Sequence, residues 1–457
     1  MAGERRQHDS SMKRVSDRER HGAARAFTLV ELLVASTIAL TVMGALATLF
    51  STFSRTASTS QAIVDMTSRM RATGHRLRQD LEGVTVKVGP WTDPASDSGY
   101  FELIEGPRSD CTDATRKILP ASSLGGDPDD VLLFTTRSTA SPFIGKFGYS
   151  TISAPCAEVA WFCKEAPVQP VTGVTVFTVY RKQFLVMPYV AIPPFSANAL
   201  PVSIGGGLSD ATLTYDISLR RDGAVLRPNS LGDLARRENR FRHQALFPFE
   251  FLPADKTDLS GALHSATFDA AENKNSSVRE GEDVVLQNVL SFDVRVFDPN
   301  ASFNAGANGP IFPGEPGFNA AVVSGTCGAY VDLGWNGDAP TAISAPFPPL
   351  AGITAFQSGG MLLVNRAGSP RLSPPTYDTW SSHYEVNGLD DDADGLRDEG
   401  TNGEDDDGDG VPDNRTERET SPAYPVPLRG IEVRLRCIEP TTKEIRQVTI
   451  RHAFPQN

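Results

Sequence analysis

The chain has few cysteines and lacks the short motifs that mark the commonest catalytic sites. Its 457 residues include five cysteines but no C-x-x-C pair, which argues against a zinc site or a thioredoxin-like redox motif. The patterns G-x-S-x-G, P-loop, G-x-G-x-x-G and H-E-x-x-H are all missing. These absences remove the usual signatures of serine hydrolases, nucleotide-binding enzymes and zinc proteases. We therefore expect the chain not to be an enzyme.

Positive charge is also scarce. No basic patch of the kind that binds nucleic acid is present, and the formal net charge is −13. Residues 387–419 alone hold 14 acidic residues and three arginines, a local charge of −11. The acidity therefore belongs to one segment, and we expect no nucleic-acid partner.

The cysteines are compatible with two states. If most of the chain lies outside the cytoplasm, one or two disulfides can form and at least one thiol remains. Cys156 and Cys163 are the closest pair in sequence, and both are expected on one extended strand. Buried free thiols are the alternative. The remaining cysteines are Cys111, Cys327 and Cys437.

Proline is missing between Phe27 and Gly89, so no proline interrupts a helix there. Further along this stretch, apolar residues recur at helical spacing on one face: Ile63, Met66, Met70, Leu77 and Leu81. We predict a single helix from about 27 to 82. Its segment 51–84 is expected to be an amphipathic continuation that packs against a head domain, with Gly74 as a soft point.

Residues 27–50 are almost entirely apolar and carry one formal charge. A helix of this length rises about 36 Å, enough to cross a hydrocarbon core of about 30 Å. Residues 1–26 contain seven Lys/Arg and four acidic residues, and positive residues beside a span favour a cytoplasmic location for that flank. The sequence thus predicts a single-pass transmembrane helix at 27–50, with the N-terminus inside and the head outside.

The apolar segment 27–50 has three possible interpretations, and its one charged residue, Glu31, helps to distinguish them. A cleaved secretory signal has an apolar region of about 7–15 residues, shorter than this one. A plain anchor fits the length, but a carboxylate at mid-bilayer costs about 2.5–3.5 kcal/mol on insertion scales. An acid retained at that cost is expected to have a function, which is the third interpretation.

The run Ala26-Phe27-Thr28-Leu29-Val30-Glu31 resembles the prepilin cleavage and methylation motif of the type IV pilin superfamily. The resemblance implies that residues 1–26 are a leader, that prepilin peptidase cuts between Ala26 and Phe27, and that Phe27 is then N-methylated. Ala26 stands where the family usually has glycine. Glu31 would be the fifth mature residue, and its carboxylate would pair with the N-terminal ammonium of a neighbouring subunit, which leaves neither charge buried alone.

Two further segments resemble J-type minor pseudopilins of type II secretion: "RLRQDLEGV" at 76–84, and 155–186, where "EVAWF" is followed by "VYRK". The resemblance implies a subunit that assembles through its N-terminal helix at the tip of a type II secretion or type IV pilus-like filament. It also implies other pseudopilin subunits, prepilin peptidase, an inner-membrane assembly platform and membrane lipid as partners. The implied location is the bacterial inner membrane, with the head in the periplasm.

Strands are predicted beyond the helix, in runs rich in β-branched and aromatic residues. They lie at 130–138, 158–164, 174–186, 285–298, 430–439 and 445–454, with a further candidate at 329–335. The last two of the six alternate and are joined by a short turn, which predicts a hairpin. Gly/Pro/Asn-rich stretches at 187–235, 253–283 and 299–378 are expected to be loop insertions. The predicted fold class is α+β, with the long helix packed on a mainly antiparallel β-sheet head at 85–457 that carries large insertions.

The acidic segment contains a tandem repeat at 387–416 with a period of 15 residues. In calcium-binding loops, carboxylates at positions 1, 3 and 5 converge when glycine occupies position 6, and positions 7 (through the carbonyl) and 9 add ligands. The matching residues are Asp390, Asp392, Asp394, Leu396 and Asp398 in the first copy, and Asp405, Asp407, Asp409, Val411 and Asp413 in the second. We predict two calcium ions with a structural role.

The repeats differ from an EF-hand at position 12, where they carry Thr401 and Thr416 instead of glutamate. Helices are not predicted on either side, so the loops are more similar to the calcium repeats of thrombospondin type 3 modules. The alternative is a solvated acidic loop without metal. His383, just before the first copy, is expected to be an ordinary polar residue and not a ligand.

Two other functions stay open. A minor pilin or adhesin would use the calcium-bearing insertion to bind a surface or a ligand. A membrane-tethered, calcium-dependent hydrolase would need a catalytic site in the head, for which Cys327, His243 and His264 are the candidate residues.

Overall fold

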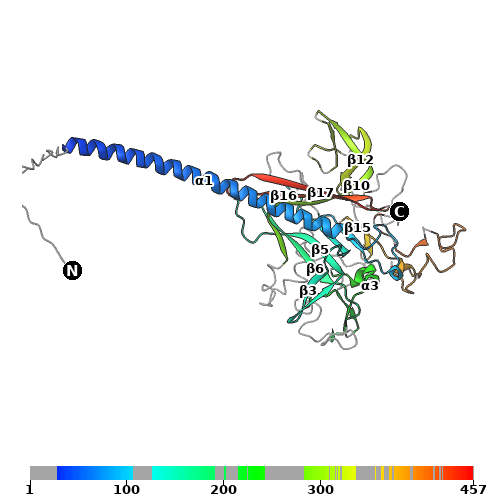
Figure 1. Ribbon diagram of the computed structural model, residues 1–457. Helices are drawn as coiled ribbons and strands as arrows, with labels where there is room; N and C mark the ends of the chain where they lie inside the picture. Colours follow the sequence, from blue (N-terminus) through cyan, green and yellow to red (C-terminus); the bar gives the residue numbers. More distant parts are fainter. Residues whose placement is uncertain are drawn as a thin grey trace, which may run out of the picture. The chain divides into compact units, whose positions relative to one another are not determined.

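In the computed structural model the chain forms one long helix and a large antiparallel sheet (Figure 1). It divides into two compact units, Met1–Gln61 and Ala62–Asn457. The structure describes residues 28–106, 126–190, 200–201, 215–241, 283–335, 356, 362–364, 370–372 and 375–455, with gaps at 224, 308, 314, 316, 320–321, 392–394, 415–416, 421, 423 and 425.

The helix α1 spans Leu29–Glu82, which confirms the predicted single helix. From Ala62 onward it belongs to the second unit, where Met70, Leu77 and Leu81 are buried as their spacing predicts. The interpretation of Gly74 as a soft point stays a prediction. The helix runs through it without interruption, and a Cβ at this position would lie 3.4 Å from Val448, so the glycine marks a close approach to the sheet.

The main sheet has ten strands. Eight form a continuous path in the order β15 (Thr376–Asp378), β1 (Phe101–Ile104), β2 (Val131–Arg137), β5 (Cys156–Glu165), β6 (Phe177–Leu185), β10 (Val284–Gly306), β16 (Gly430–Ile438) and β17 (Ile445–Ala453). The strands β11 (Gly309–Ile311) and β12 (Gly325–Val331) also pair with β10. All of these pairs are antiparallel, so the fold class is the predicted α+β.

Both faces of the central strands are buried, which explains why β5 is apolar from Cys156 to Cys163 with the exception of the buried Glu158. Trp161 and Cys163 face the core that contains the buried residues of α1. Cys156 and Phe162 face a second core, formed with Leu234 and its neighbours. The separation of seven residues thus places Cys156 and Cys163 on opposite faces of one strand.

The C-terminal strands pair as the predicted hairpin. In β16 and β17, Gly430 lies opposite Ala453, and Ile438 lies opposite Ile445. In Figure 1 the C-terminal part of α1 lies beside these two strands, in agreement with the approach of Gly74 to β17. The hairpin therefore supports the helix directly.

Two of the three predicted insertions are more regular than expected, and the third, 253–283, lies outside the described residues except for its last residue. The stretch 187–235 contains β7 (Leu200–Pro201), β8 (Leu219–Asp222), β9 (Val225–Pro228) and α3 (Leu231–Ala235), and η2 (Arg237–Asn239) follows it. The stretch 299–378 contains the end of β10, β11, β12, β13 (Leu362–Val364), β14 (Pro370–Leu372) and β15. Other short elements are η1 (Pro94–Ser96), β3 (Phe143–Phe147), β4 (Ser150–Ala154) and η5 (Ser382–Glu385). Strands of two to five residues are too short to show a periodic pattern in sequence.

Candidate assembly and metal-binding sites

The first turn of α1 is closed by a reciprocal contact between Thr28 and Glu31. Glu31 Oε2 accepts from the Thr28 N–H (2.9 Å) and from the Thr28 hydroxyl (3.1 Å), and the Glu31 N–H donates to Thr28 Oγ1 (3.3 Å). This is a capping box, which satisfies N–H groups that have no partner within the helix. Its T-x-x-E signal is readable in sequence, and our sequence reasoning missed it. The predicted cleavage site, Ala26 and Phe27, lies outside the described residues.

Of the helices that the structure describes, α1 is the one long and apolar enough to cross a membrane. Its large apolar side chains between Leu29 and Phe53 are exposed, Leu29 by 81% and Phe53 by 74%. Such a surface is unfavourable in water and favourable in a hydrocarbon core. The first part of α1 is therefore compatible with a membrane anchor.

A buried ion pair fixes the second part of α1 to the sheet. Asp80 accepts from Arg181 Nε (2.6 Å) and Nη2 (2.8 Å), and from the indole N–H of Trp161 (3.0 Å). The Asp80 and Arg181 side chains are only 2% and 7% exposed. A bidentate pair of this kind fixes orientation as well as distance, so it sets where α1 sits on β5 and β6. Sequence reasoning did not identify this contact.

The two acidic repeats fold alike at the glycine of position 6. Gly395 has φ 106° and donates its N–H to Asp390 Oδ2 (3.1 Å). Gly410 has φ 89° and donates to Asp405 Oδ2 (2.9 Å). The positive φ that glycine supplies turns the chain back toward the first aspartate, as the predicted calcium loop requires.

The ends of the repeats are also equivalent. Asp398 and Asp413 both adopt a left-handed conformation, with φ of 51° and 53°. Asp398 accepts from the N–H of Gly388 (2.9 Å), and Asp413 accepts from that of Gly403 (2.7 Å). Hydrogen bonds repeated at a shift of 15 residues show that the two copies are one structural unit used twice.

Two glutamates beyond the repeats hold the loops in place. Glu417 accepts from the N–H groups of Asp406 (2.7 Å) and Asn414 (2.8 Å). Glu419 does the same for the first copy, accepting from Asp391 and from Asp398 (2.6 Å). Sequence reasoning missed both glutamates, because they lie outside the repeated pattern.

In the second copy, carboxylate oxygens of Asp405, Asp407 and Glu417 all lie within 4.8 Å of one another. Ligands at about 2.3–2.6 Å from one calcium ion lie at most about 5 Å apart, so these groups fit a shared ion. The other predicted ligands of this copy, Asp409, Val411 and Asp413, are in the same described loop. In the first copy Asp390, Leu396 and Asp398 are described, whereas Asp392 and Asp394 lie outside the described residues.

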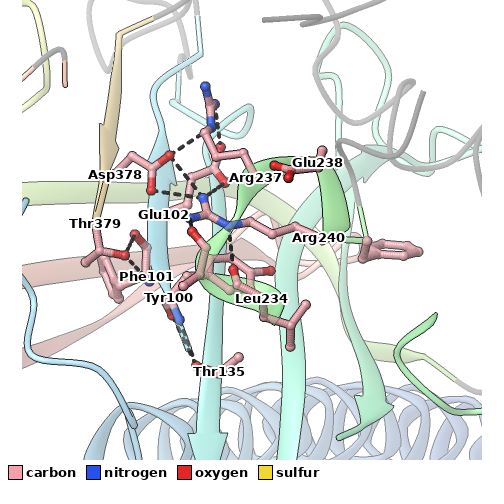
Figure 2. A network of polar contacts seen from close by, with 12 residues as sticks. Tyr100, Phe101, Glu102, Thr135, Leu234, Arg237, Glu238, Arg240, Asp378 and Thr379 are labelled. Carbon is pink, nitrogen blue, oxygen red and sulfur yellow. Dashed lines mark hydrogen bonds and ion pairs between the residues drawn. The ribbon is translucent and has the colours of Figure 1, made fainter. Parts of the chain in front are cut away.

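A second group of charges is buried where β1 and β15 meet the segment after α3 (Figure 2). Arg240 Nη1 donates to Glu102 (3.0 Å) and Asp378 (2.9 Å), and Arg237 pairs with the same two carboxylates at 3.3 and 2.8 Å. Arg240 also lies over the ring of Tyr100, 4.2 Å from its centroid. Two guanidinium groups thus meet two carboxylates, a balanced set that fastens the segment after α3 to β1 and β15. We assign it a structural role.

Of the three candidate hydrolase residues, the structure describes only Cys327. Cys327 is exposed on β12, and His243 and His264 lie outside the described residues. His383 lies in η5 beside Tyr384, with ring centroids 5.8 Å apart. Burial lowers the pKa of His383 to about 4, and the nearby charge of Arg236 acts in the same direction.

The described cysteines are Cys156, Cys163, Cys327 and Cys437, and all four are free thiols. The disulfide considered between Cys156 and Cys163 therefore does not form in this structure, which agrees with the alternative of free thiols for this pair. Cys111 lies outside the described residues.

No family model, no curated protein and no solved structure matches the chain.

Proposed function

We propose that the chain is a non-catalytic, minor pseudopilin-like subunit that assembles at the tip of a type II secretion or type IV pilus-like filament. In this proposal residues 1–26 are removed by prepilin peptidase, Phe27 is N-methylated, and the head lies outside a bacterial inner membrane. One observation carries the proposal. A single unbroken helix exposes apolar surface in its first part, packs into a head with its second part, and carries an acid in its first turn.

The position of Glu31 supports assembly through α1. The N-terminal end of a helix carries partial positive charge, which favours a carboxylate there, and the capping box uses Oε2. These contacts are local and do not neutralise a full charge in lipid. The ammonium group of a neighbouring mature subunit would do so, which makes filament assembly the state in which the acid is compensated.

The acidic repeats support calcium as a structural cofactor of the head. The pattern of oxygens fits a hard divalent cation, and the equivalent hydrogen bonds of the two copies favour two ions. Extracellular calcium modules bind at about 10⁻⁴–10⁻³ M, a range suited to a head outside the cytoplasm. Glu417 and Glu419 would connect the metal loops to the chain that leads into β16.

The test separates the charge of Glu31 from its capping role. Gln at this position keeps the capping box but removes the charge. In cells that contain the filament machinery, Glu31→Gln is expected to lower incorporation into filaments at least about tenfold, because the partner ammonium is left buried without its counter-charge. The measurement is the amount of the subunit in purified filaments, relative to its amount in membranes.

The matched control is Thr28→Ala, which removes the capping hydroxyl and keeps the acid. It is expected to assemble normally once its processing has been checked by mass. If Glu31→Gln assembled as well as the unchanged chain while Thr28→Ala did not, Glu31 would act only as a helix cap and the proposal would be wrong.

A further inference from the structure

A cluster of acidic side chains lies inside the head, apart from the tandem repeats. Carboxylate oxygens of Glu105, Asp127 and Asp130 lie within 4.8 Å of one another, and all three residues are buried. Glu105 directly follows β1, and Asp130 directly precedes β2. Because the two strands are antiparallel, both residues lie at the same end of the strand pair, which is called the acidic edge below. The backbone N–H of Phe292 donates to the Asp127 carbonyl (2.7 Å), which places the acidic edge against β10.

The three carboxylates differ in how they are satisfied. Asp130 accepts from the N–H groups of Gly106 (3.1 Å) and Val294 (2.6 Å), and Glu105 accepts from that of Leu333 (3.1 Å). Asp127 is completely buried, yet neither of its side-chain oxygens has a hydrogen-bond partner. A buried polar group without a partner is destabilising, and a buried charge more so. Backbone contacts therefore hold two of the carboxylates in place beside a third that has none.

Other acidic side chains near the cluster add to its excess of negative charge. Two further carboxylates, Asp332 and Asp293, also act electrostatically on Glu105. Arg295 is already paired with these two aspartates, at 3.2 and 2.9 Å. Within the described chain, no ion pair joins a basic side chain to Glu105, Asp127 or Asp130. The buried set of Figure 2, by contrast, has one guanidinium for each carboxylate.

Two glycines make the close packing of the acidic edge feasible. A Cβ at Gly106 would lie 2.2 Å from the carboxyl group of Asp129, and a Cβ at Gly126 would lie 2.2 Å from the Leu290 carbonyl oxygen. Side chains at these positions would push the acidic segment away from β1 and β10. The backbone is therefore shaped so that like charges come together, an arrangement that needs a compensating positive charge or protons.

We propose that Glu105, Asp127 and Asp130 bind a divalent cation of the calcium type inside the head, where the ends of β1 and β2 meet β10. Three carboxylates supply up to six oxygens, the donor type that hard cations prefer. The ion would neutralise the cluster, give Asp127 its missing partner and fasten the segment before β2 to β10. The site is distinct from the tandem repeats and does not depend on filament assembly.

The experiment counts calcium in the full chain, purified in detergent. In the variant Asp390→Asn/Asp405→Asn, which removes the first ligand of each repeat, we expect one calcium per chain to remain after equilibrium dialysis at millimolar free calcium. Adding Asp127→Asn, which keeps the shape and removes the charge, should abolish it. The matched control is Asp222→Asn, an exposed acid on β8, which should leave the count unchanged.

A count of zero in the repeat variant would overturn the proposal and would indicate that protons neutralise the cluster. A count of one that survives Asp127→Asn would also overturn it. If the triple variant does not fold, crystals of the unchanged chain grown in calcium decide the question by anomalous diffraction. A peak between the three carboxylates is expected, and peaks at the repeats without one here would contradict the site.

Discussion

The carboxylate of Glu31 caps the first turn of α1, and in our proposal it also pairs with a neighbouring subunit in the filament. The hydrogen bonds to Thr28 explain why an acid is favourable as a cap at the third position of α1. They do not explain why the adjoining surface is apolar and exposed. A residue can thus have a visible local role and a second role that appears only in an assembly, and substitutions must be chosen to separate the two.

His383 allows a prediction of pH dependence. Its pKa is lowered from 6.5 to about 4 by burial. Between these values the unfolded chain binds a proton that the folded chain does not, so stability falls as the pH decreases from 6.5 toward 4. In His383→Asn this loss is absent, and its melting temperature should fall less between pH 7 and pH 5 than that of the unchanged chain. Calorimetry in calcium-free buffer checks the prediction, and identical pH dependence of the two proteins would contradict it.

Among the elements, α1 is fixed to the sheet by the buried pair of Asp80 and Arg181, together with hydrogen bonds from Thr73 to Val285 and from Thr136 to Asp80. Replacing Asp80 by Asn leaves the Arg181 guanidinium buried without its carboxylate, which should lower the free energy of unfolding by about 3–5 kcal/mol. Denaturant unfolding of the head measures this change. The control is Glu82→Gln, an exposed acid two residues on, which should change stability by less than about 0.5 kcal/mol. If Asp80→Asn lowered the free energy of unfolding as little as the control does, apolar packing alone would hold α1 against the sheet.

The repeats form an element that should depend on metal. If calcium saturates them at about one hundred times its dissociation constant, chelation removes about 2.7 kcal/mol per ion and lowers the melting temperature by a few degrees. Asp405→Asn should reduce this response. Glu404→Gln, an exposed neighbour outside the ligand pattern, removes the same charge and should keep it. A melting temperature that chelator does not change would leave the loops without structural calcium.

Some strands could be predicted from the sequence and others could not. Strands buried on both faces, such as β5, and the alternating hairpin strands β16 and β17 were predicted because burial imposes a pattern on many consecutive residues. The short strands β1 and β15 were not predicted. Their pairing depends on residues 272 or more positions apart, Ile104 with Thr376 for example, and nothing local announces such a pair.

The candidate sites divide in the same way. The repeats were predicted because two copies of one spacing are visible in sequence. Glu417 was not, because its contact with Asp406 depends on how the chain turns after the second copy. Glu105 and Asp127 were not either, since antiparallel pairing of β1 and β2 brings them together across an intervening segment. Ligands within one loop can be read from spacing, whereas ligands from separate strands require the fold.

At the scale of the whole molecule, the chain combines a long apolar helix with a head that concentrates its acidic groups in separate places. The repeats carry them in an exposed loop, and the cluster around Asp127 carries them in the interior. In our proposals both places bind calcium. The proposed membrane topology and the proposed metal sites therefore agree, because the helix would deliver the head to the compartment where its acids can be neutralised.

The most direct measurement of the central proposal is the mass of the N-terminal peptide of the protein isolated from its native membranes. Processing as a pseudopilin predicts that the first residue is an N-methylated Phe27. An N-terminal peptide that still contains residues 1–26 would contradict it.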